Sequence, residues 1–230
     1  MRRLVFRDRA VYLPDADALV VADIHLGRAD ASDVDFPLGE RADLTDRLAA
    51  LCERFDPTEV VFAGDVLHRF ERVSARDVES LDSVLETCRG ADSTPILVAG
   101  NHDTMLDSVC DDSVHDSYRL SDETLVAHGH EEPEERAPLY VVGHDHPTLD
   151  IEGRTRPCAL YGPKCYRGGD VLMLPAFTRL AAGVTVNGMS AADFQSPFVS
   201  NSGVLRPFIR DDDADETLTF PPLEKLRRYL

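Results

Sequence analysis

Residues 60–68 read Val-Val-Phe-Ala-Gly-Asp-Val-Leu-His, an apolar run that meets a glycine and then presents a carboxylate. Such a run is typical of a buried strand that ends in a tight turn, here with Asp65 at its tip. Most Gly-Asp pairs are ordinary turns, so the meaning of Asp65 depends on the rest of the chain. Four other apolar runs also end in potential ligand residues: Asp23/His25, Asn101/His102, His128 and His144/His146. We expect these runs to converge on Asp65, which would lie between two metal ions.

The first half of the chain alternates predicted strands with predicted helices. Besides the run that leads to Asp65, strands are expected at 3–13, 18–23 and 95–99. Helices are expected at 38–55 and 74–89, with Ser74 as an N-cap and with Pro57 and Gly90 as stops. The resulting β-α-β-α-β order predicts a parallel sheet, and catalytic groups of such sheets gather at the carboxyl ends of the strands.

The second half of the chain is richer in short strands. They are expected, between Gly and Pro turns, at 118–127, 139–142, 148–151, 157–161, 170–174 and 183–186. This pattern predicts a second sheet that packs on the first, in a single α/β domain spanning residues 1–210. Residues 211–230 are predicted to form an acidic linker and a short C-terminal tail, with a short helix from residue 223.

The composition is that of a globular protein with an acidic surface. The chain has 230 residues, a hydrophobic share of 43%, a net charge of −18 and only two lysines, Lys164 and Lys225. Acid spread along a whole chain is typical of salt-loving proteins, because molar salt screens the repulsion; binding of basic partners is the alternative. The sequence shows neither an apolar run long enough to span a membrane nor a signal peptide. Five cysteines without a C-x-x-C pair favour reduced thiols in a cytoplasmic protein.

The polar residues at the strand ends form a ligand set without a thiolate. Its members are carboxylates, imidazoles and one amide: Asp23, His25, Asp65, Asn101, His128, His144 and His146. Any one of these histidines alone would equally fit a surface or capping residue. As a group, their nitrogen and oxygen donors suit Mn²⁺, Fe²⁺, Zn²⁺ or Co²⁺. Two ions about 3.5–4 Å apart need a bridging carboxylate, and the isolated Asp65 is best placed to bridge.

In chain order, the motifs are D-x-H (Asp23, His25), G-D (Gly64, Asp65), G-N-H-D (Gly100 to Asp103), a strand-end histidine (His128) and G-H-x-H (Gly143 to His146). This set resembles that of the calcineurin-like metallophosphoesterases over residues 18–147. The DIHLG and GHDHP forms, followed by Leu174-Pro175-Ala176-Phe177 and Ser196-Pro197, resemble the small archaeal phosphoesterases related to the SbcD/Mre11 nuclease subunit. The resemblance implies an α/β fold with a four-layer α-β-β-α sandwich of two mixed sheets.

The same resemblance implies which residues hold the two divalent ions, expected to be Mn²⁺, with Fe²⁺, Zn²⁺, Co²⁺ or Ni²⁺ as alternatives. The first ion would be held by Asp23, His25, Asp65 and His146. The second ion would be held by Asp65, Asn101, His128 and His144.

Further roles are implied for residues beside the ligands. His102 would stabilise charge on the phosphoryl group and protonate the leaving oxygen, with Asp103 or another carboxylate orienting it. His68 and Arg69 are expected either to contact substrate or to lie in an exposed turn, and His130 is expected either directly behind the ligands or at the rim. Rim loops are also expected at 28–38 and 131–138.

The expected reaction is hydrolysis of a phosphoester, first of all a phosphodiester, by a hydroxide that bridges the two ions. A DNA-repair nuclease is the more specific form, although no basic patch is readable in the sequence. Lys164, Arg167 and Arg179 are either phosphate contacts or ordinary surface charges. The alternatives are a small-molecule phosphodiesterase or phosphomonoesterase and, outside the enzymes, a metal-binding scaffold. The intact motifs argue against a scaffold.

Overall fold

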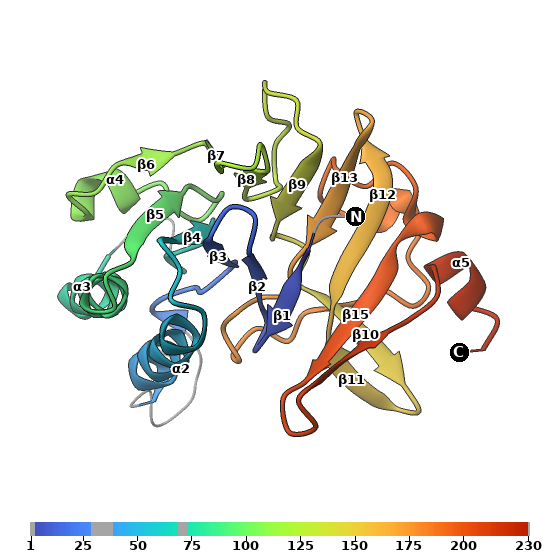
Figure 1. Ribbon diagram of the computed structural model, residues 1–230, viewed down its shortest axis with the longest axis horizontal. Helices are drawn as coiled ribbons and strands as arrows, with labels where there is room; N and C mark the ends of the chain where they lie inside the picture. The colour runs from blue at the N-terminus through green and yellow to red at the C-terminus, as the bar shows by residue number, and fades with distance from the viewer. Residues whose placement is uncertain (1–2, 29–38, 69–72, 230) are drawn as a thin grey trace.

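A computed structural model describes residues 3–28, 39–68 and 73–229, and it is organised around sheets (Figure 1). Arg69 and nearly all of the expected rim loop at 28–38 lie outside the described residues. Two large mixed sheets carry the fold, and a small three-stranded sheet accompanies them. The predicted mixed α/β fold with more than one mixed sheet is therefore confirmed.

The first sheet has six strands in sequence order. They are β1 (Val5–Arg7), β2 (Ala10–Leu13), β3 (Ala18–Val21), β4 (Glu59–Ala63), β5 (Thr94–Val98) and β6 (Val114–His115). β3 to β6 run parallel, while β1 and β2 form an antiparallel hairpin that pairs with β3. The single strand expected at 3–13 is thus wrong. Asp8 and Arg9 both adopt positive φ angles, of 42° and 64°, and turn the chain between the two strands.

Two helices cover one face of this sheet, as predicted. They are α2 (Glu40–Phe55) and α3 (Ala75–Gly90). The Ser74 side chain accepts a hydrogen bond from the Asp77 amide, and the Asp77 carboxylate accepts one from the Ser74 amide, which satisfies the first turn of α3. Leucines on the buried helix faces pack against Leu19, Val21 and Phe62 of the sheet. The predicted N-cap of α3 is confirmed.

The second sheet has seven strands in the order β16-β15-β12-β13-β9-β8-β7. They are β7 (Ser117–Arg119), β8 (Leu125–Ala127), β9 (Leu139–Val142), β12 (Ala159–Tyr166), β13 (Gly169–Met173), β15 (Arg206–Asp211) and β16 (Glu216–Thr219). The strand expected at 118–127 is instead the hairpin of β7 and β8. β15 and β16 form a further hairpin, and the acidic run expected to be a linker supplies its turn. An acidic turn carries no apolar pattern, so the sequence did not predict this hairpin.

The two large sheets enclose one core between them, and the second sheet has another on its outer face. Val20, Val61 and Val98 of the first sheet pack against residues such as Val126, Val141 and Leu172 of the second. The outer core is covered by irregular segments that carry Phe194 and Phe198, by α5 (Leu223–Leu226) and by the three-stranded sheet of β10 (Pro147–Ile151), β11 (Arg154–Pro157) and β14 (Val184–Thr185). The outer layer over the second sheet therefore consists of short elements, whereas the outer layer over the first sheet consists of α2 and α3.

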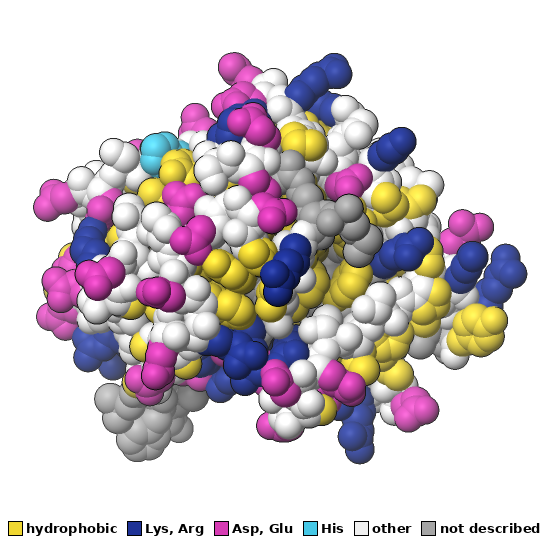
Figure 2. Space-filling model, viewed as in Figure 1, with side chains coloured by type: hydrophobic (Ala, Val, Ile, Leu, Met, Phe, Trp, Pro, Cys, Tyr) yellow, Lys and Arg dark blue, Asp and Glu magenta, His cyan; other side chains and the backbone are white. Residues whose placement is uncertain are grey.

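The surface combines scattered acid with one basic gathering. Figure 2 shows Asp and Glu side chains over most of the visible face, while Lys and Arg gather below the lower end of β1. All five cysteines are free. In the described part of the chain, no helix is both long and apolar enough to cross a membrane.

Candidate metal centre

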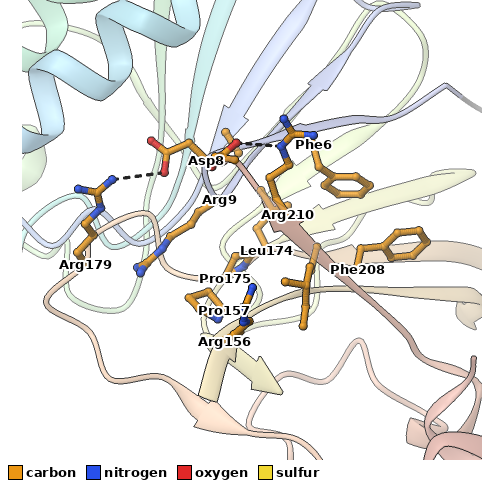
Figure 3. A pocket seen from close by; sticks show the side chains of 14 residues that line it. Phe6, Asp8, Arg9, Arg156, Pro157, Leu174, Pro175, Arg179, Phe208 and Arg210 are labelled. Atoms are coloured by element: carbon orange, nitrogen blue, oxygen red, sulfur yellow. Dashed lines mark hydrogen bonds and ion pairs between the residues drawn. The ribbon is translucent and has the colours of Figure 1, made fainter. Parts of the chain in front are cut away.

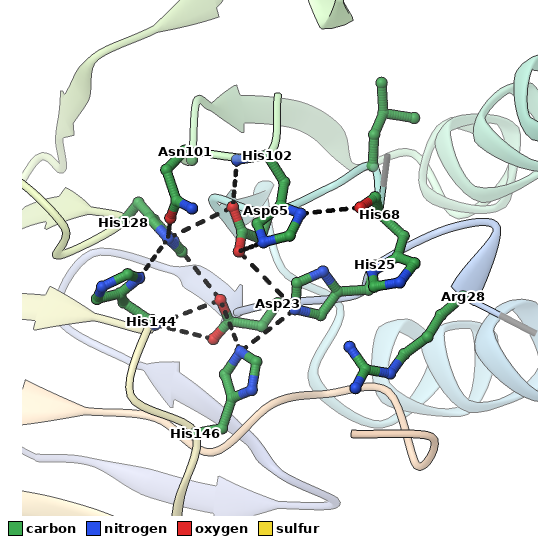
Figure 4. Close-up of polar contacts among 12 residues, drawn as sticks. Asp23, His25, Arg28, Asp65, His68, Asn101, His102, His128, His144 and His146 are labelled. Carbon is green, nitrogen blue, oxygen red and sulfur yellow. Dashed lines mark hydrogen bonds and ion pairs between the residues drawn. The ribbon is translucent and has the colours of Figure 1, made fainter. Parts of the chain in front are cut away.

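Five loops meet at one edge of the two large sheets, each directly after a strand. They follow β3, β4 and β5 of the first sheet and β8 and β9 of the second. These loops bring all seven expected ligands together, as Figure 4 shows: Asp23, His25, Asp65, Asn101, His128, His144 and His146. The assignment of individual ligands to individual ions stays a prediction.

The first cluster lies around His25 and His146. Their Nε2 atoms are 3.3 Å apart, and His146 Nε2 is also 3.3 Å from Asp23 Oδ1. His25 Nε2 lies 3.8 Å from Asp65 Oδ2. Ligand atoms of Asp23, His25 and His146 all lie within 4.8 Å of one another, which is the spacing of donors around one ion.

The second cluster lies around His128. Its Nε2 atom is 3.0 Å from Asn101 Oδ1, 3.1 Å from His144 Nδ1 and 3.4 Å from Asp65 Oδ1. Its other ring nitrogen, Nδ1, lies 3.3 Å from the Ala63 carbonyl oxygen. A carbonyl oxygen only accepts, so Nδ1 carries the proton and Nε2 presents a lone pair. Nε2 therefore faces three further potential ligand atoms, an arrangement that a cation would stabilise.

Burial favours the neutral forms of His25 and His128 and disfavours the charged form of Asp65. Burial lowers the pKa of His25 to about 3 and that of His128 to about 4, because the protonated rings would lose their hydration. Burial, together with the charges of Asp23 and Asp103, raises the pKa of Asp65 to about 8. A divalent cation would favour the ionised carboxylate, so the donor set fits metal binding.

The backbone around the ligands is bent sharply. Five ligand residues adopt the left-handed region with φ between 45° and 73°: Asp23, His25, Asp65, His144 and His146. Non-glycine residues seldom occupy this region, and they cluster at functional sites where the surrounding structure holds them. Here the hydrogen bonds from the His25 amide to Asp65 O and from the Asp23 amide to Gly64 O, at 2.9 and 3.1 Å, fix the two turns to each other.

Two motif glycines allow the loops to approach the ligand side chains. A Cβ atom on Gly64 would overlap the His128 ring, and one on Gly100 would overlap the carboxylate of Asp65. Gly64 also has a φ of +78°. The G-D and G-N-H-D motifs therefore place backbone directly against ligands, which only glycine permits.

His102 and Asp103 take different positions although they are adjacent. His102 Nδ1 is 2.8 Å from the His68 carbonyl oxygen, so this nitrogen donates and Nε2 points into the centre, 3.8 Å from Asp65 Oδ2. Asp103 is buried and accepts hydrogen bonds from the amides of Val66, Leu67 and Gly100. Asp103 thereby ties the loop after β5 to the loop after β4, and its catalytic role stays a prediction.

His68 and His130 border the centre on two sides. The His68 ring stacks on His102 with 5.8 Å between the ring centroids and meets His25 edge-on at 5.4 Å. Its contact with substrate stays a prediction. His130 lies 5.1 Å from His128 by ring centroids and 3.9 Å from Glu131, and its position behind the ligands or at the rim stays a prediction.

Three residues outside the expected ligand set adjoin the centre: Arg28, which belongs to the expected rim loop 28–38, and Asp145 and Arg47, which the sequence reasoning missed. Arg28 lies beside His25 and His146 in Figure 4, and its Nε donates to Leu180 O at 3.3 Å. Asp145 is buried and accepts from the Gln195 and Ser196 amides at 2.8 and 3.1 Å. Arg47 of α2 stacks on the Phe177 ring at 3.9 Å from its centroid and donates to Phe177 O. No motif marks any of the three, although Asp145 lies inside G-H-x-H.

The chain was compared with solved structures, and the first one below shares its architecture. The nuclease MPE of Pseudomonas putida has a TM-score of 0.65 and 24% identity, with 96% of this chain and 95% of that chain covered. The Escherichia coli phosphoesterase YfcE has a TM-score of 0.45 and 15% identity, with 87% and 96% covered. No curated protein matches the chain. Residues 17–176 match the calcineurin-like phosphoesterase family. The chain therefore belongs to this family and is a metal-dependent hydrolase of phosphoesters.

Proposed function

We propose that the protein hydrolyses phosphodiesters with two divalent metal ions that share Asp65. The observation that carries the proposal is the placement of the two Asp65 oxygens. Oδ2 faces His25 of the first cluster at 3.8 Å, and Oδ1 faces His128 of the second cluster at 3.4 Å. A carboxylate with one oxygen toward each set of donors suits a bridge between two ions, with Mn²⁺ as the first choice for this ligand set.

The ions, when bound, would polarise the phosphoryl oxygens and lower the pKa of a coordinated water. The chain's own contribution beyond the ligands centres on His102. Because the His68 carbonyl holds the proton on Nδ1, His102 presents Nε2 to the centre. In its protonated form this nitrogen would donate a hydrogen bond to the phosphoryl group or a proton to the leaving oxygen. Asp103 would act as a positioning residue, because it fixes the turn that carries His102 and Asn101.

Nucleic acid is the first substrate to test, since the structurally similar Pseudomonas putida protein is a nuclease. A small phosphodiester is the second candidate, and one observation favours it. A cavity of about 720 Å³ adjoins His128 and is lined by Glu131, Glu132, Glu134 and Glu135. This acidic cavity would repel a polyanion at low salt, because unscreened like charges raise the cost of binding.

The test combines metal content with a substrate panel. Protein stripped with a chelator would be reloaded with Mn²⁺, Zn²⁺ or Fe²⁺, and bound metal would be counted by mass spectrometry. Turnover would be compared for an aryl phosphodiester, an aryl phosphomonoester and single- and double-stranded DNA, each at low and molar salt. We expect two ions per chain and faster turnover of diesters than of monoesters. A full activity with one ion per chain would contradict the shared-carboxylate proposal.

The comparison of turnover at low and molar salt also tests the salt-loving character suggested by the net charge of −18. If the acidic surface is adapted to salt, DNA turnover should rise between low and molar salt. In an ordinary nuclease, DNA turnover falls as the salt concentration rises, because salt weakens contacts to phosphates. The aryl phosphodiester serves as the control, since the binding of a small substrate with one charge depends less on salt screening of the acidic surface.

A further inference from the structure

A second cavity, separate from the metal centre, is lined by arginines. It has a volume of about 330 Å³ and lies between the β1–β2 turn, β11, β15 and the segment that follows β13. Its arginines come from four separate segments: Arg9, Arg156, Arg179 and Arg210. Figure 3 shows Arg9 and Arg179 toward one end, and Phe6 and Phe208 toward the other. We refer to it as the arginine cavity.

Arg9 is a partly buried cation held by carbonyl oxygens, with the carboxylates of Asp8 and Asp43 near enough to act on its charge but not to pair with it directly. Its Nη1 donates to the carbonyl oxygens of Ala176 and Thr178, at 3.2 and 2.6 Å. Among the described residues, no carboxylate forms an ion pair with Arg9. Burial and the nearby charge of Arg47 lower the pKa of Arg9 to about 10. Buried charges are normally paired, so this guanidinium has room for an anion.

The acids that line the cavity are bound by other arginines. Asp8 receives Arg47 at 2.6 and 3.0 Å, and Asp212 receives Arg7 at 3.1 Å as well as Arg210 at 2.9 Å. They are therefore already neutralised. The remaining two arginines are themselves exposed: Arg156 is 42% exposed and lies 3.5 Å from Asp211, and Arg179 is 57% exposed and lies 2.8 Å from Asp43 and 4.0 Å from Asp8. Such exposed pairs are weak, so both side chains can turn to an anion.

The opposite end of the cavity is flat and apolar. The rings of Phe6 and Phe208 are stacked, with 5.3 Å between centroids and 22° between planes. Pro157, Leu174 and Pro175 continue this wall. Aromatic rings of this kind are platforms on which nucleobases stack, and arginines bind phosphate through paired N–H donors.

We propose that the arginine cavity binds a nucleotide, with its phosphate between Arg9 and Arg179 and its base against Phe6 and Phe208. A volume of about 330 Å³ falls within the range of small-ligand sites. The ligand is either a free mononucleotide or one nucleotide of a strand. Binding needs no metal and no hydrolysis, so it goes beyond the function proposed above.

A single chain segment, residues 176–178, lies between the arginine cavity and the metal centre. The carbonyls of Ala176 and Thr178 contact Arg9, while the amide of Phe177 donates to Ala22 O at 2.8 Å and that of Thr178 to Asp23 O at 3.5 Å. A strand held in the cavity by one nucleotide would therefore have its neighbouring phosphodiesters close to the ligands of the first cluster. A free mononucleotide held there would instead lie next to the segment 176–178, which hydrogen-bonds to the backbone at Ala22 and Asp23.

The test is calorimetric titration of metal-free protein in a chelator, so that failure of the metal centre does not affect it. The probes are dAMP, deoxyadenosine, inorganic phosphate and a short oligo-deoxyadenylate. We expect saturable binding of dAMP, with deoxyadenosine and phosphate at least about tenfold weaker, because each lacks half of the contacts. An oligonucleotide that binds more tightly than dAMP identifies a strand as the source, and equal affinity identifies the mononucleotide.

Substitutions locate the binding. Arg156→Gln and Arg179→Gln should each weaken dAMP binding about tenfold, and Phe208→Leu should weaken dAMP but not inorganic phosphate. Arg89→Gln is the matched control: its side chain is 47% exposed, against 42% for Arg156, and it pairs with Asp112 on the α3 side of the molecule. Arg9 is left intact because it supports the segment beside Asp23. Absence of saturable dAMP binding up to about 10 mM, or an equal effect of Arg89→Gln, would overturn the proposal.

Discussion

The metal centre and the arginine cavity lie on opposite sides of the segment 176–178, yet they are assembled differently. In the metal centre, ligands come in short motifs directly after strands, and the left-handed backbone at residues such as Asp23 and Asp65 sets their direction. In the cavity, each arginine comes from a different segment and is held by side-chain contacts. A single substitution in a site fixed by the backbone should therefore remove most of its activity. A single substitution in a site of independent side chains should weaken binding only in part.

The largest effect is expected for Asp65→Asn. The amide cannot supply a negative oxygen to both clusters, so we expect turnover to fall more than about 1,000-fold, or about 4 kcal/mol of transition-state stabilisation. Metal content should fall in parallel. The exposed Asp82 of α3 offers a control in Asp82→Asn, which should keep both. An Asp65→Asn protein with normal turnover would refute the shared carboxylate, whereas dAMP binding in the cavity should be unaffected.

Gly100→Ala tests whether the backbone fixes the metal centre. The added methyl group would overlap the Asp65 carboxylate, although Gly100 does not have a positive φ. We expect a loss of about 100-fold to 1,000-fold in activity, with reduced metal affinity and a folded chain. Gly90→Ala is the matched control, because a Cβ there meets nothing within 4 Å. Equal behaviour of the two variants would mean that the loop adapts to the methyl group.

Arg47 connects the two regions, and Arg47→Leu should destabilise both. Its guanidinium is 8% exposed and donates to Asp8, Asp43 and Phe177 O. Removing one partner of a largely buried pair should lower the free energy of unfolding by about 3 kcal/mol. Denaturant unfolding checks this value. A loss below about 1 kcal/mol, as for an exposed pair, would show that the segment 176–178 is held by other contacts.

His102→Ala should separate chemistry from metal binding. Loss of a positioned acid or hydrogen-bond donor typically costs about 100-fold in turnover, and we expect that loss in kcat. The bound metal should stay at the wild-type level, since the ring contacts Asp65 only through Nε2 at 3.8 Å. Metal counting on the same sample is the check. Metal loss equal to that of Asp65→Asn would make His102 a ligand instead.

The smallest effect is expected in the β2–β3 hairpin, whose open end lies next to both Arg9 and Asp23 and whose turn carries Asp17. Tyr12 Oη donates to Asp17 at 2.7 Å, and this hydrogen bond with the Asp17 carboxylate raises the pKa of Tyr12 to about 12. Tyr12→Phe should cost about 1 kcal/mol. Because the folded pKa is raised above 10, this stability is present below pH 10 and is lost as the pH rises through about 12. Thermal unfolding of both proteins at pH 8 and pH 11 should show the difference shrinking.

The contrast also explains what the sequence could predict. The placement of expected ligands such as Asp65 and His128 at one edge was predictable because apolar runs mark the strands and parallel strand ends share an edge. The β1–β2 hairpin was not, since Asp8 and Arg9 turn without glycine. The β15–β16 hairpin was hidden by its acidic turn, and Arg47 looked like any charge on an amphipathic helix. The arginine cavity depends on contacts between distant segments, which no local pattern encodes.

The division of the chain between its two large sheets has a consequence for biosynthesis. Every strand of the first sheet lies within residues 5–115, and every strand of the second within 117–219. On the ribosome, the first sheet and its helices are therefore complete while the second is still emerging. Until then, the face that carries Val20, Val61 and Val98 is uncovered. The strands that cover this face, β8, β9 and β13, follow later in the chain, so we expect the nascent chain to have its greatest need of chaperones midway through synthesis.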